Sequence, residues 1–231
     1  MRAICLFDID GTLLSTGGAG QRAMEQALGL VFGITKITGE ILAAGRTDRA
    51  ITSDLFAQHG LVPTDAEWER FQTVYFDQLT SMLASLNGLV LPGVSQLLRA
   101  LSQRDDVALG LLTGNFREGA SRKLKHYGLD HYFAFGGYGD FHRDRDDVAR
   151  TAWDAAVESL GEPPLTAARQ GGRLFVIGDT PADVRCARAI GAQAVAVATG
   201  IYSHETLAET APDQLYQNFQ DPQPLIDSIC R

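Results

Sequence analysis

The stretch AICLFDIDGTLL, residues 3–14, decides how the chain is interpreted. Its apolar run indicates a buried β-strand over residues 3–9, yet the run ends in two carboxylates, Asp8 and Asp10, and turns at Gly11. Side chains two positions apart on a strand point to the same face, so the two acids come together. Like charges that are close repel, and burial adds to the cost. The stretch therefore predicts a positive group at this strand end.

The remainder of the chain alternates between short apolar runs and helical patterns. Proline at helix starts and glycine past helix ends mark the boundaries, as in the segment that begins at Pro181 and stops at Gly191. We predict further strands at 107–113, 132–137, 173–179 and 192–199, with a weaker one at 215–219. This order is typical of an α/β fold with a three-layer, Rossmann-like parallel sheet core.

Residues 15–89 interrupt the alternation, because they contain three helical patterns and no convincing strand. The last pattern carries an apolar stripe at spacings of three and four, formed by Trp68, Phe71, Tyr75, Leu79, Met82 and Leu86. Turn-forming residues bracket the segment at 15–20 and 87–93. We therefore predict a helical cap domain at 15–89, inserted through two hinges into a core domain formed by 1–14 and 90–231.

Composition narrows the class of protein. The chain has 231 residues, 45% of them hydrophobic, and a net charge of −8, which argues against binding to nucleic acid or to an anionic membrane through bulk charge. No apolar run approaches the roughly 20 residues of a membrane span, and the N-terminus lacks a signal-peptide pattern. Three scattered cysteines suit a reducing compartment. We expect a cytoplasmic protein, and the oligomeric state stays open.

Polar residues follow four of the predicted strands. Each group has an ordinary explanation on its own, as a turn, a helix cap or a solvated charge run. In parallel sheets, however, ligands bind outside the carboxyl ends of the strands, where all four groups would meet. The groups are Asp8 with Asp10, then Thr113, then Arg143 with Arg145, and then Asp179 with Asp183. Their common position predicts a site.

The residue types suggest phosphoryl chemistry. Several acids at one sheet end suit Mg²⁺, which binds carboxylates together with water and phosphate oxygens. A cationic side chain and a hydroxyl beside the metal would hold a phosphoryl group and neutralise the charge that develops during its transfer. One carboxylate can then attack phosphorus to form an aspartyl-phosphate, while its neighbour protonates the leaving oxygen and later activates water.

Three motifs in this order, DIDGTL, LLTGN and GDTPAD, strongly resemble those of the haloacid dehalogenase-like hydrolases, and the helical insertion resembles the cap of the phosphoglycolate phosphatase and β-phosphoglucomutase branch. The resemblance implies that Asp8 is the nucleophile and Asp10 the acid/base. It also implies that Asp179 and the Asp10 backbone carbonyl bind Mg²⁺ with Asp8, and that Asp183 supports Asp179. For phosphate or substrate binding it implies Gly11, Thr12, Thr113, Gly114 and Asn115.

One position departs from the family pattern. Most relatives place a lysine after the third strand, usually in a KPxP setting, whereas Lys123 and Lys125 of this chain lie too early, on the preceding helix. An ungapped comparison puts Arg143 at that position, while the D-R-[ND] stretch of some relatives selects Arg145, which we prefer. Arginine binds phosphate through its planar fork but is not equivalent to lysine.

The cap segment GRTDRA, residues 45–50, offers Arg46 as a side chain that could reach an anionic substrate group. The alternative is a plain loop and helix start capped by Thr47 or Asp48. The second acid of D-x-D argues against a dehalogenase, as the resemblance implies. We expect a Mg²⁺-dependent phosphatase acting on a small phosphorylated metabolite, with phosphoglycolate the leading candidate. A phosphomutase of the β-phosphoglucomutase type and a non-catalytic binding protein on the same fold are the alternatives.

Overall fold

The computed structural model describes residues 3–34, 36–37, 43–161, 166 and 168–230. Its centre is a six-stranded sheet in the order β5-β4-β1-β6-β7-β8, in which every neighbouring pair is parallel. The strands are β1 (Ala3–Phe7), β4 (Val107–Leu112), β5 (Phe135–Gly137), β6 (Leu174–Gly178), β7 (Gln193–Val197) and β8 (Gln214–Tyr216). The predicted α/β class is confirmed, and the weak strand expected at 215–219 is shorter and spans Gln214–Tyr216.

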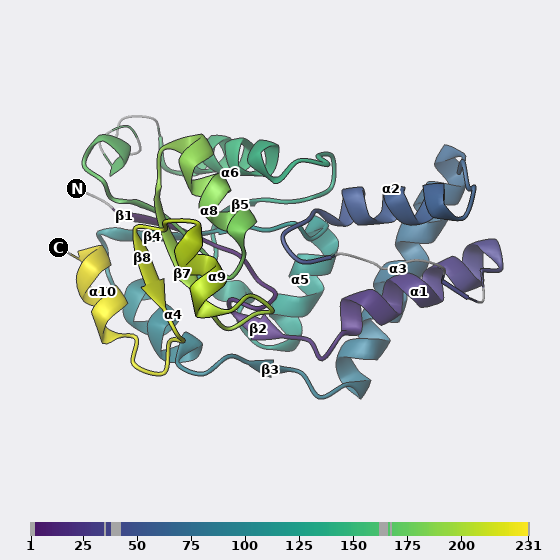
Figure 1. Cartoon of the computed structure of the whole chain (residues 1–231), viewed down its shortest axis with the longest axis horizontal. Helices are drawn as coiled ribbons and strands as arrows, with labels where there is room; N and C mark the ends of the chain where they lie inside the picture. The colour runs from purple at the N-terminus through teal and green to yellow at the C-terminus, as the bar shows by residue number, and fades with distance from the viewer. Residues whose placement is uncertain (1–2, 35, 38–42, 162–165, 167, 231) are drawn as a thin grey trace.

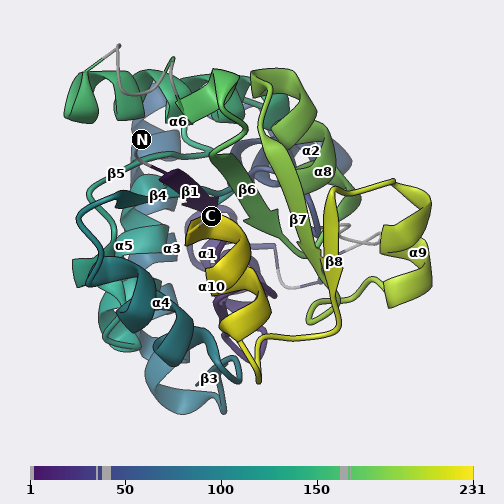
Figure 2. The same ribbon diagram turned by 90° about the vertical axis from the view of Figure 1, so that its left-hand side faces the viewer.

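Helices cover both faces of this sheet, which gives the predicted three layers (Figure 2). Along β1, alternate side chains face opposite layers: Cys5 and Phe7 belong to one apolar cluster, and Ile4 and Leu6 to the other. The first cluster includes residues of α4 (Val94–Ser102), α5 (Arg117–His126) and α10 (Gln223–Cys230), and the second includes residues of α6 (Arg145–Leu160), α8 (Pro181–Ile190) and α9 (His204–Glu209). Because β1 is buried on both faces, its sequence is continuously apolar.

Strand β5 starts three residues later than its sequence predicts. Residues 132–137 were expected to be extended, but a 3-10 turn, η1 (Asp130–Tyr132), precedes β5 and delays its start to Phe135. The turn is stabilised by backbone hydrogen bonds from Tyr132 N–H to Leu129 O and from Phe133 N–H to Asp130 O. The aromatic residues of this segment favour a strand. The N–H groups of Tyr132 and Phe133 are, however, bonded within the turn and are not available for a strand hydrogen bond.

Three further helices, α1 (Ala19–Phe32), α2 (Asp48–Gln58) and α3 (Asp65–Ser85), lie together beyond one end of the sheet (Figure 1). They share a separate apolar cluster, in which the Phe71 ring contacts the rings of Phe56, Trp68 and Tyr75. The stripe predicted on the last helix therefore packs against the other two helices. A capping box at Thr64 and Glu67 starts α3, which fixes where the stripe begins.

Two short strands join the two parts. β2 (Leu14–Ser15) pairs antiparallel with β3 (Leu89–Val90), so the chain leaves and re-enters the sheet region side by side. Strands of two residues are too short to show a period in the sequence. We propose that α1, α2 and α3 form the predicted cap domain and that this ribbon is its hinge.

Among the helices of the described ranges, none has the length and apolarity needed to cross a bilayer.

Candidate active site

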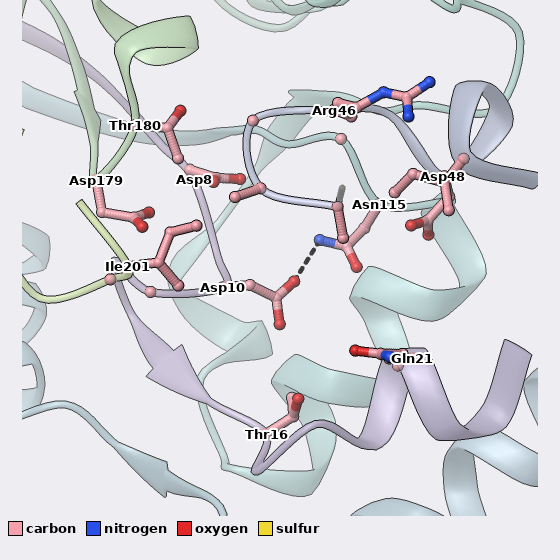
Figure 3. Close-up of a pocket in the computed structure, with 18 of the residues that line it drawn as sticks. Asp8, Asp10, Thr16, Gln21, Arg46, Asp48, Asn115, Asp179, Thr180 and Ile201 are labelled. Carbon is pink, nitrogen blue, oxygen red and sulfur yellow. Dashed lines mark hydrogen bonds between the residues drawn. The ribbon is translucent and has the colours of Figure 1, made fainter. Parts of the chain in front are cut away.

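A cavity of about 530 Å³ lies between the carboxyl ends of the strands and the three-helix layer (Figure 3). From the sheet side it is lined by Asp8, Asp10, Gly114, Asn115, Lys123, Arg145 and Asp179. From the helical side it is lined by Thr16, Gln21, Met24, Arg46, Asp48, Ile51 and Tyr75. Of the polar residues predicted at the strand ends, Asp8, Asp10, Arg145 and Asp179 therefore meet in this cavity, as the parallel topology allows.

Three buried acids form the deepest part of the site. Asp8 follows β1, Asp179 follows β6, and Asp183 lies in the first turn of α8. Carboxylate oxygens from these three residues lie within 4.8 Å of one another. Burial raises the pKa of Asp8 to about 6, with Arg145 opposing the shift and Asp183 adding to it. Burial and the charges of Asp183 and Asp8 raise the pKa of Asp179 well above its usual range. The cluster therefore holds more negative charge than its protein partners neutralise.

The turn after β1 and the start of α8 fix these acids in place. The Thr12 hydroxyl donates to Asp179 Oδ1 at 2.9 Å. Gly11 has a φ of +82°, and a Cβ atom there would lie 2.4 Å from Asp179 Oδ2. Asp183 accepts from the Thr180 backbone N–H at 3.0 Å and from its hydroxyl at 2.7 Å, which forms a capping box. The GDTPAD segment is thus a helix cap and also a supplier of buried carboxylates.

This donor set fits a hard divalent cation. Mg²⁺ prefers carboxylate oxygens and retains several waters, so two or three acids around one point suffice. The raised pKa values of Asp8 and Asp179 give the second indication, because a cation between them would stabilise the charged forms that burial disfavours. Asp8 and Asp179 could therefore hold the metal, and Asp183 could contribute through the same cluster.

Of the two candidate arginines, the structure brings Arg145 to the acids. Its Nη2 atom lies 2.5 Å from Asp183 Oδ1 and 3.5 Å from Asp8 Oδ1, and the side chain is buried. Its Nε has no hydrogen-bond partner among the described residues, so a donor is left inside a buried site. Arg143 lies outside the cavity, with an exposed side chain that pairs at 2.7 Å with Asp54 of α2.

Asp10 takes part in a different set of contacts from Asp8. Asn115 Nδ2 donates to Asp10 Oδ2 at 2.8 Å, and Lys123 Nζ donates to the same oxygen at 2.6 Å. The Lys123 ammonium also donates to Asn115 Oδ1 at 2.6 Å. Lys123 lies on α5, before the third strand of the predicted order, as its place in the sequence indicates, but it reaches the site from there, a contact that the sequence patterns did not predict. The missed signal is a lysine on the buried face of α5, beside Ala120 and Leu124.

The loop after β4 contributes mainly through Gly114 and Asn115. The Thr113 side chain is fully buried behind the cavity wall, where its hydroxyl accepts from Asn115 Nδ2 at 2.8 Å and from the Asn115 backbone N–H at 3.3 Å. Thr113 therefore orients Asn115. Thr12 is likewise fully buried and directs its hydroxyl to Asp179, away from the space that a substrate would occupy.

The GRTDRA segment adopts the loop and helix start of the plainer interpretation. Thr47 caps α2 by accepting from the Ala50 N–H at 3.1 Å. The Arg46 guanidinium hydrogen-bonds to Asp54, and Figure 3 shows it pointing away from Asp8 and Asp10. Arg46 nevertheless lines the cavity, so its predicted role in specificity stays a prediction.

Asp48 is a residue of this segment that the sequence offered only as a cap of its own helix. Its backbone N–H donates to Gly114 O at 2.7 Å, and its carboxylate accepts from the Phe116 N–H at 2.9 Å. The helical layer thereby contacts the loop after β4 and the start of α5. Burial raises the pKa of Asp48 to about 6, and the nearby Lys123 opposes the shift.

Comparison with known proteins agrees with this geometry. Residues 3–191 match a family model described as haloacid dehalogenase-like hydrolase. The chain is 28% identical to the phosphoglycolate phosphatase of Synechococcus elongatus over 100% of both chains. It is 26% identical to the "Probable phosphatase IndB" of Dickeya dadantii, over 96% of this chain and 92% of the relative. The crystal structure of CbbY from Rhodobacter sphaeroides in complex with phosphate covers 96% of each chain with a TM-score of 0.72 at 19% identity. The last likeness shows a shared fold.

Proposed function

The chain belongs to the haloacid dehalogenase-like hydrolases, and we propose that it is a Mg²⁺-dependent phosphatase of small phosphorylated metabolites that works through an aspartyl-phosphate on Asp8. The match over residues 3–191 confirms the family predicted from the three motifs. The single observation that carries the proposal is the cluster of Asp8, Asp179 and Asp183 beside Arg145 at the carboxyl ends of the strands. Phosphatase relatives over nearly the whole chain support the reaction class.

In the proposed first step, a carboxylate oxygen of Asp8 attacks phosphorus. A pKa of about 6 leaves Asp8 mostly ionised at neutral pH, as a nucleophile must be. Arg145 Nη2 lies 3.5 Å from Asp8 Oδ1, so the guanidinium is placed to neutralise charge on a phosphoryl group at Asp8. The Asn115 side chain and the Gly114 backbone line the same space. When bound at Asp8 and Asp179, Mg²⁺ would supply charge neutralisation for the phosphoryl oxygens.

Asp10 is the proposed acid/base. It donates a proton to the leaving oxygen as the ester bond breaks, and in the second step its carboxylate takes a proton from the water that attacks the phosphorus of the aspartyl-phosphate. Its position beside the cavity but outside the three-acid cluster supports this division, because a proton donor must face the leaving group and not the metal. Closure of the proposed cap domain would exclude bulk water during the first step.

The experiment that tests the proposal is a phosphate-release screen over phosphorylated metabolites, run with Mg²⁺ and with a chelator. We expect Mg²⁺-dependent turnover of at least one small ester and loss of turnover in Asp8→Asn. Undiminished turnover by Asp8→Asn would overturn the mechanism. Isomerisation of a sugar phosphate without phosphate release would indicate a phosphomutase, and metal binding with no turnover on any ester would indicate a binding protein. Either result would replace the proposed function.

We propose phosphoglycolate-like esters as the first substrates to test, and Arg46 as the residue that would select their second anionic group. The cavity position of Arg46 and the phosphoglycolate phosphatase among the relatives support this choice. Arg46→Ala should then lower kcat/KM for phosphoglycolate about tenfold while leaving kcat/KM for glycerol phosphate, which has no anionic group besides its phosphate, within about twofold. Equal effects on both esters would contradict it.

A cytoplasmic location completes the proposal, supported by the free thiols of Cys5, Cys186 and Cys230.

A further inference from the structure

The most unusual charged residue of the cavity is Lys123, because α5 carries it on its buried face. Its side chain is only 5% exposed, although lysine is seldom fully buried without a partner. Gly119, Ala120 and Leu124 share that face of the helix. Burying an ammonium group is costly unless hydrogen bonds and opposite charge compensate. We therefore expect hydrogen bonds and an opposite charge to compensate the burial of the Lys123 ammonium group.

Those contacts form a closed triangle with Asp10 and Asn115. Lys123 Nζ donates to Asp10 Oδ2 and to Asn115 Oδ1, each at 2.6 Å, and Asn115 Nδ2 donates to the same Asp10 oxygen at 2.8 Å. Both strong donors thus act on Oδ2 of Asp10. Among the residues with described placement, no hydrogen bond reaches Asp10 Oδ1. The carboxylate is consequently anchored through one oxygen, and the other is left for a ligand.

We propose that Lys123 is a positioning residue that fixes Asp10 for proton transfer, an inference that rests on the proposed function. In the first step, Asp8 forms a bond to phosphorus, and the bond to the leaving oxygen breaks with its electron pair going to that oxygen. The proton on Asp10 Oδ1 passes to the leaving oxygen, and Asp10 becomes a carboxylate whose charge lies beside the Lys123 ammonium. Lys123 itself touches no reacting atom.

This assignment divides the positive charge of the site between two side chains. Arg145 lies against Asp8 and Asp183, on the nucleophile and metal side. Lys123 lies against Asp10, on the leaving-group side. Loss of Lys123 should therefore impair the steps that need a proton donor and leave the attack by Asp8 largely intact. A purely structural role would predict a different result, namely an equal loss for all substrates.

The leaving group provides the test. The variant is Lys123→Met, which keeps the length of the side chain and removes the charge, and its matched control is Lys125→Met, an exposed residue of the same helix. The substrates are glycerol phosphate, whose alkoxide needs a proton to leave, and p-nitrophenyl phosphate, whose leaving group is stable without one. The quantity compared is kcat/KM, because it covers the reaction up to the first phosphoryl transfer and not the later attack by water.

We expect Lys123→Met to lose about 10²-fold in kcat/KM on glycerol phosphate and less than about threefold on p-nitrophenyl phosphate, because general acid catalysis is worth 10²-fold or more only where a proton is required. Lys123→Arg should recover part of the loss on the alkyl ester. In an Asp10→Asn background, Lys123→Met should cause no further loss, since the two residues act as a unit.

Equal losses on both esters, or a full additional loss in the Asp10→Asn background, would overturn the role of Lys123. The thermal midpoint of each variant is measured in parallel, and a loss confined to proteins with a lowered midpoint would also count against the proposal. Failure of the proposed function gives a separate result: the unaltered protein would then release no phosphate from either ester, or Asp8→Asn would remain active.

Discussion

Arg145 Nη2 lies 2.5 Å from Asp183 Oδ1, although the two residues are 38 positions apart in the chain. The contact joins the first residue of α6 to the first turn of α8 at the carboxyl ends of the parallel strands. Because the same nitrogen is 3.5 Å from Asp8 Oδ1, one guanidinium connects the proposed nucleophile to Asp183, a second acid of the same cluster. On this relationship we propose Arg145, and not Arg143, as the side chain that would neutralise a phosphoryl group on Asp8.

Replacing the two arginines separately should therefore give unequal effects. We expect Arg145→Ala to lower kcat/KM by about 10²-fold or more, because it removes a buried donor to the phosphoryl group and leaves Asp183 unpaired. Arg143→Ala should stay within about threefold, because it breaks only an exposed ion pair with Asp54. Steady-state kinetics on the best ester of the screen measures both. Equal, small losses would refute either arginine as the phosphate-binding cation.

Mg²⁺ binding should depend on Asp179 and on pH. Burial raises the pKa of Asp179, and a metal ligand must be deprotonated, so affinity for Mg²⁺ should rise as the pH increases from 5 to 8. Asp179→Asn should weaken binding by about tenfold or more by removing a charged ligand. Titration calorimetry of the metal-free protein with MgCl₂ gives the affinity, with Asp65→Asn, an exposed acid of α3, as the control. Unchanged Mg²⁺ affinity in Asp179→Asn would contradict this metal site.

Asp48 should make the folded state less stable as the pH rises. Its pKa in the folded protein, about 6, lies above the usual 3.8, so its contribution is fully present below about pH 3.8 and is lost as the pH rises through about 6. The difference between the two pKa values corresponds to about 1 to 3 kcal/mol of stability. Asp48→Asn keeps an oxygen for the Phe116 N–H and removes the charge. Urea unfolding at pH 4 to 7.5 should therefore show a shallower fall in the free energy of unfolding for the variant.

Asp54 provides the control of opposite sign for that experiment. The hydrogen bond from Arg46 lowers the pKa of Asp54, so its contribution is present above the usual pKa and is lost as the pH falls. Asp54→Asn should thus become relatively less stable toward neutral pH, where Asp48→Asn becomes relatively more stable. The same pH dependence in Asp48→Asn and in the unaltered protein would rule out Asp48 as the titrating group.

Gly11 should tolerate alanine poorly for two separable reasons. Both Gly11 and Gly18 have positive φ angles, +82° and +87°, so alanine at either position costs about 1 kcal/mol in backbone strain. A Cβ atom at Gly11 would also lie 2.4 Å from Asp179 Oδ2, whereas nothing lies within 4 Å of the corresponding position at Gly18. Gly11→Ala should therefore lose stability and Mg²⁺ affinity, and Gly18→Ala stability alone. Equal Mg²⁺ affinity in the two variants would contradict the clash.

The sequence by itself determined the fold class and the end of the sheet at which the polar groups gather. Both follow from local patterns: continuous apolar runs indicate strands buried on two faces, and the helices between them require parallel connections. Parallel strands place their carboxyl ends at one end of the sheet, so the sequence assigns Asp8 and Asp179 to the same end. Their direct proximity depends on the pairing of β1 with β6, which only the tertiary structure gives.

Only the tertiary structure decided between neighbouring residues and brought in distant ones. Arg143 and Arg145 are chemically identical and two positions apart, but Asp144 caps α6, so Arg145 enters the helix facing Asp183 while Arg143 stays in the loop beside Asp54. Lys123 reaches Asp10 across 113 positions because α5 packs its buried face toward the site. Local patterns fix where a strand ends, whereas the direction of a long side chain depends on the elements packed around it, which are distant in sequence.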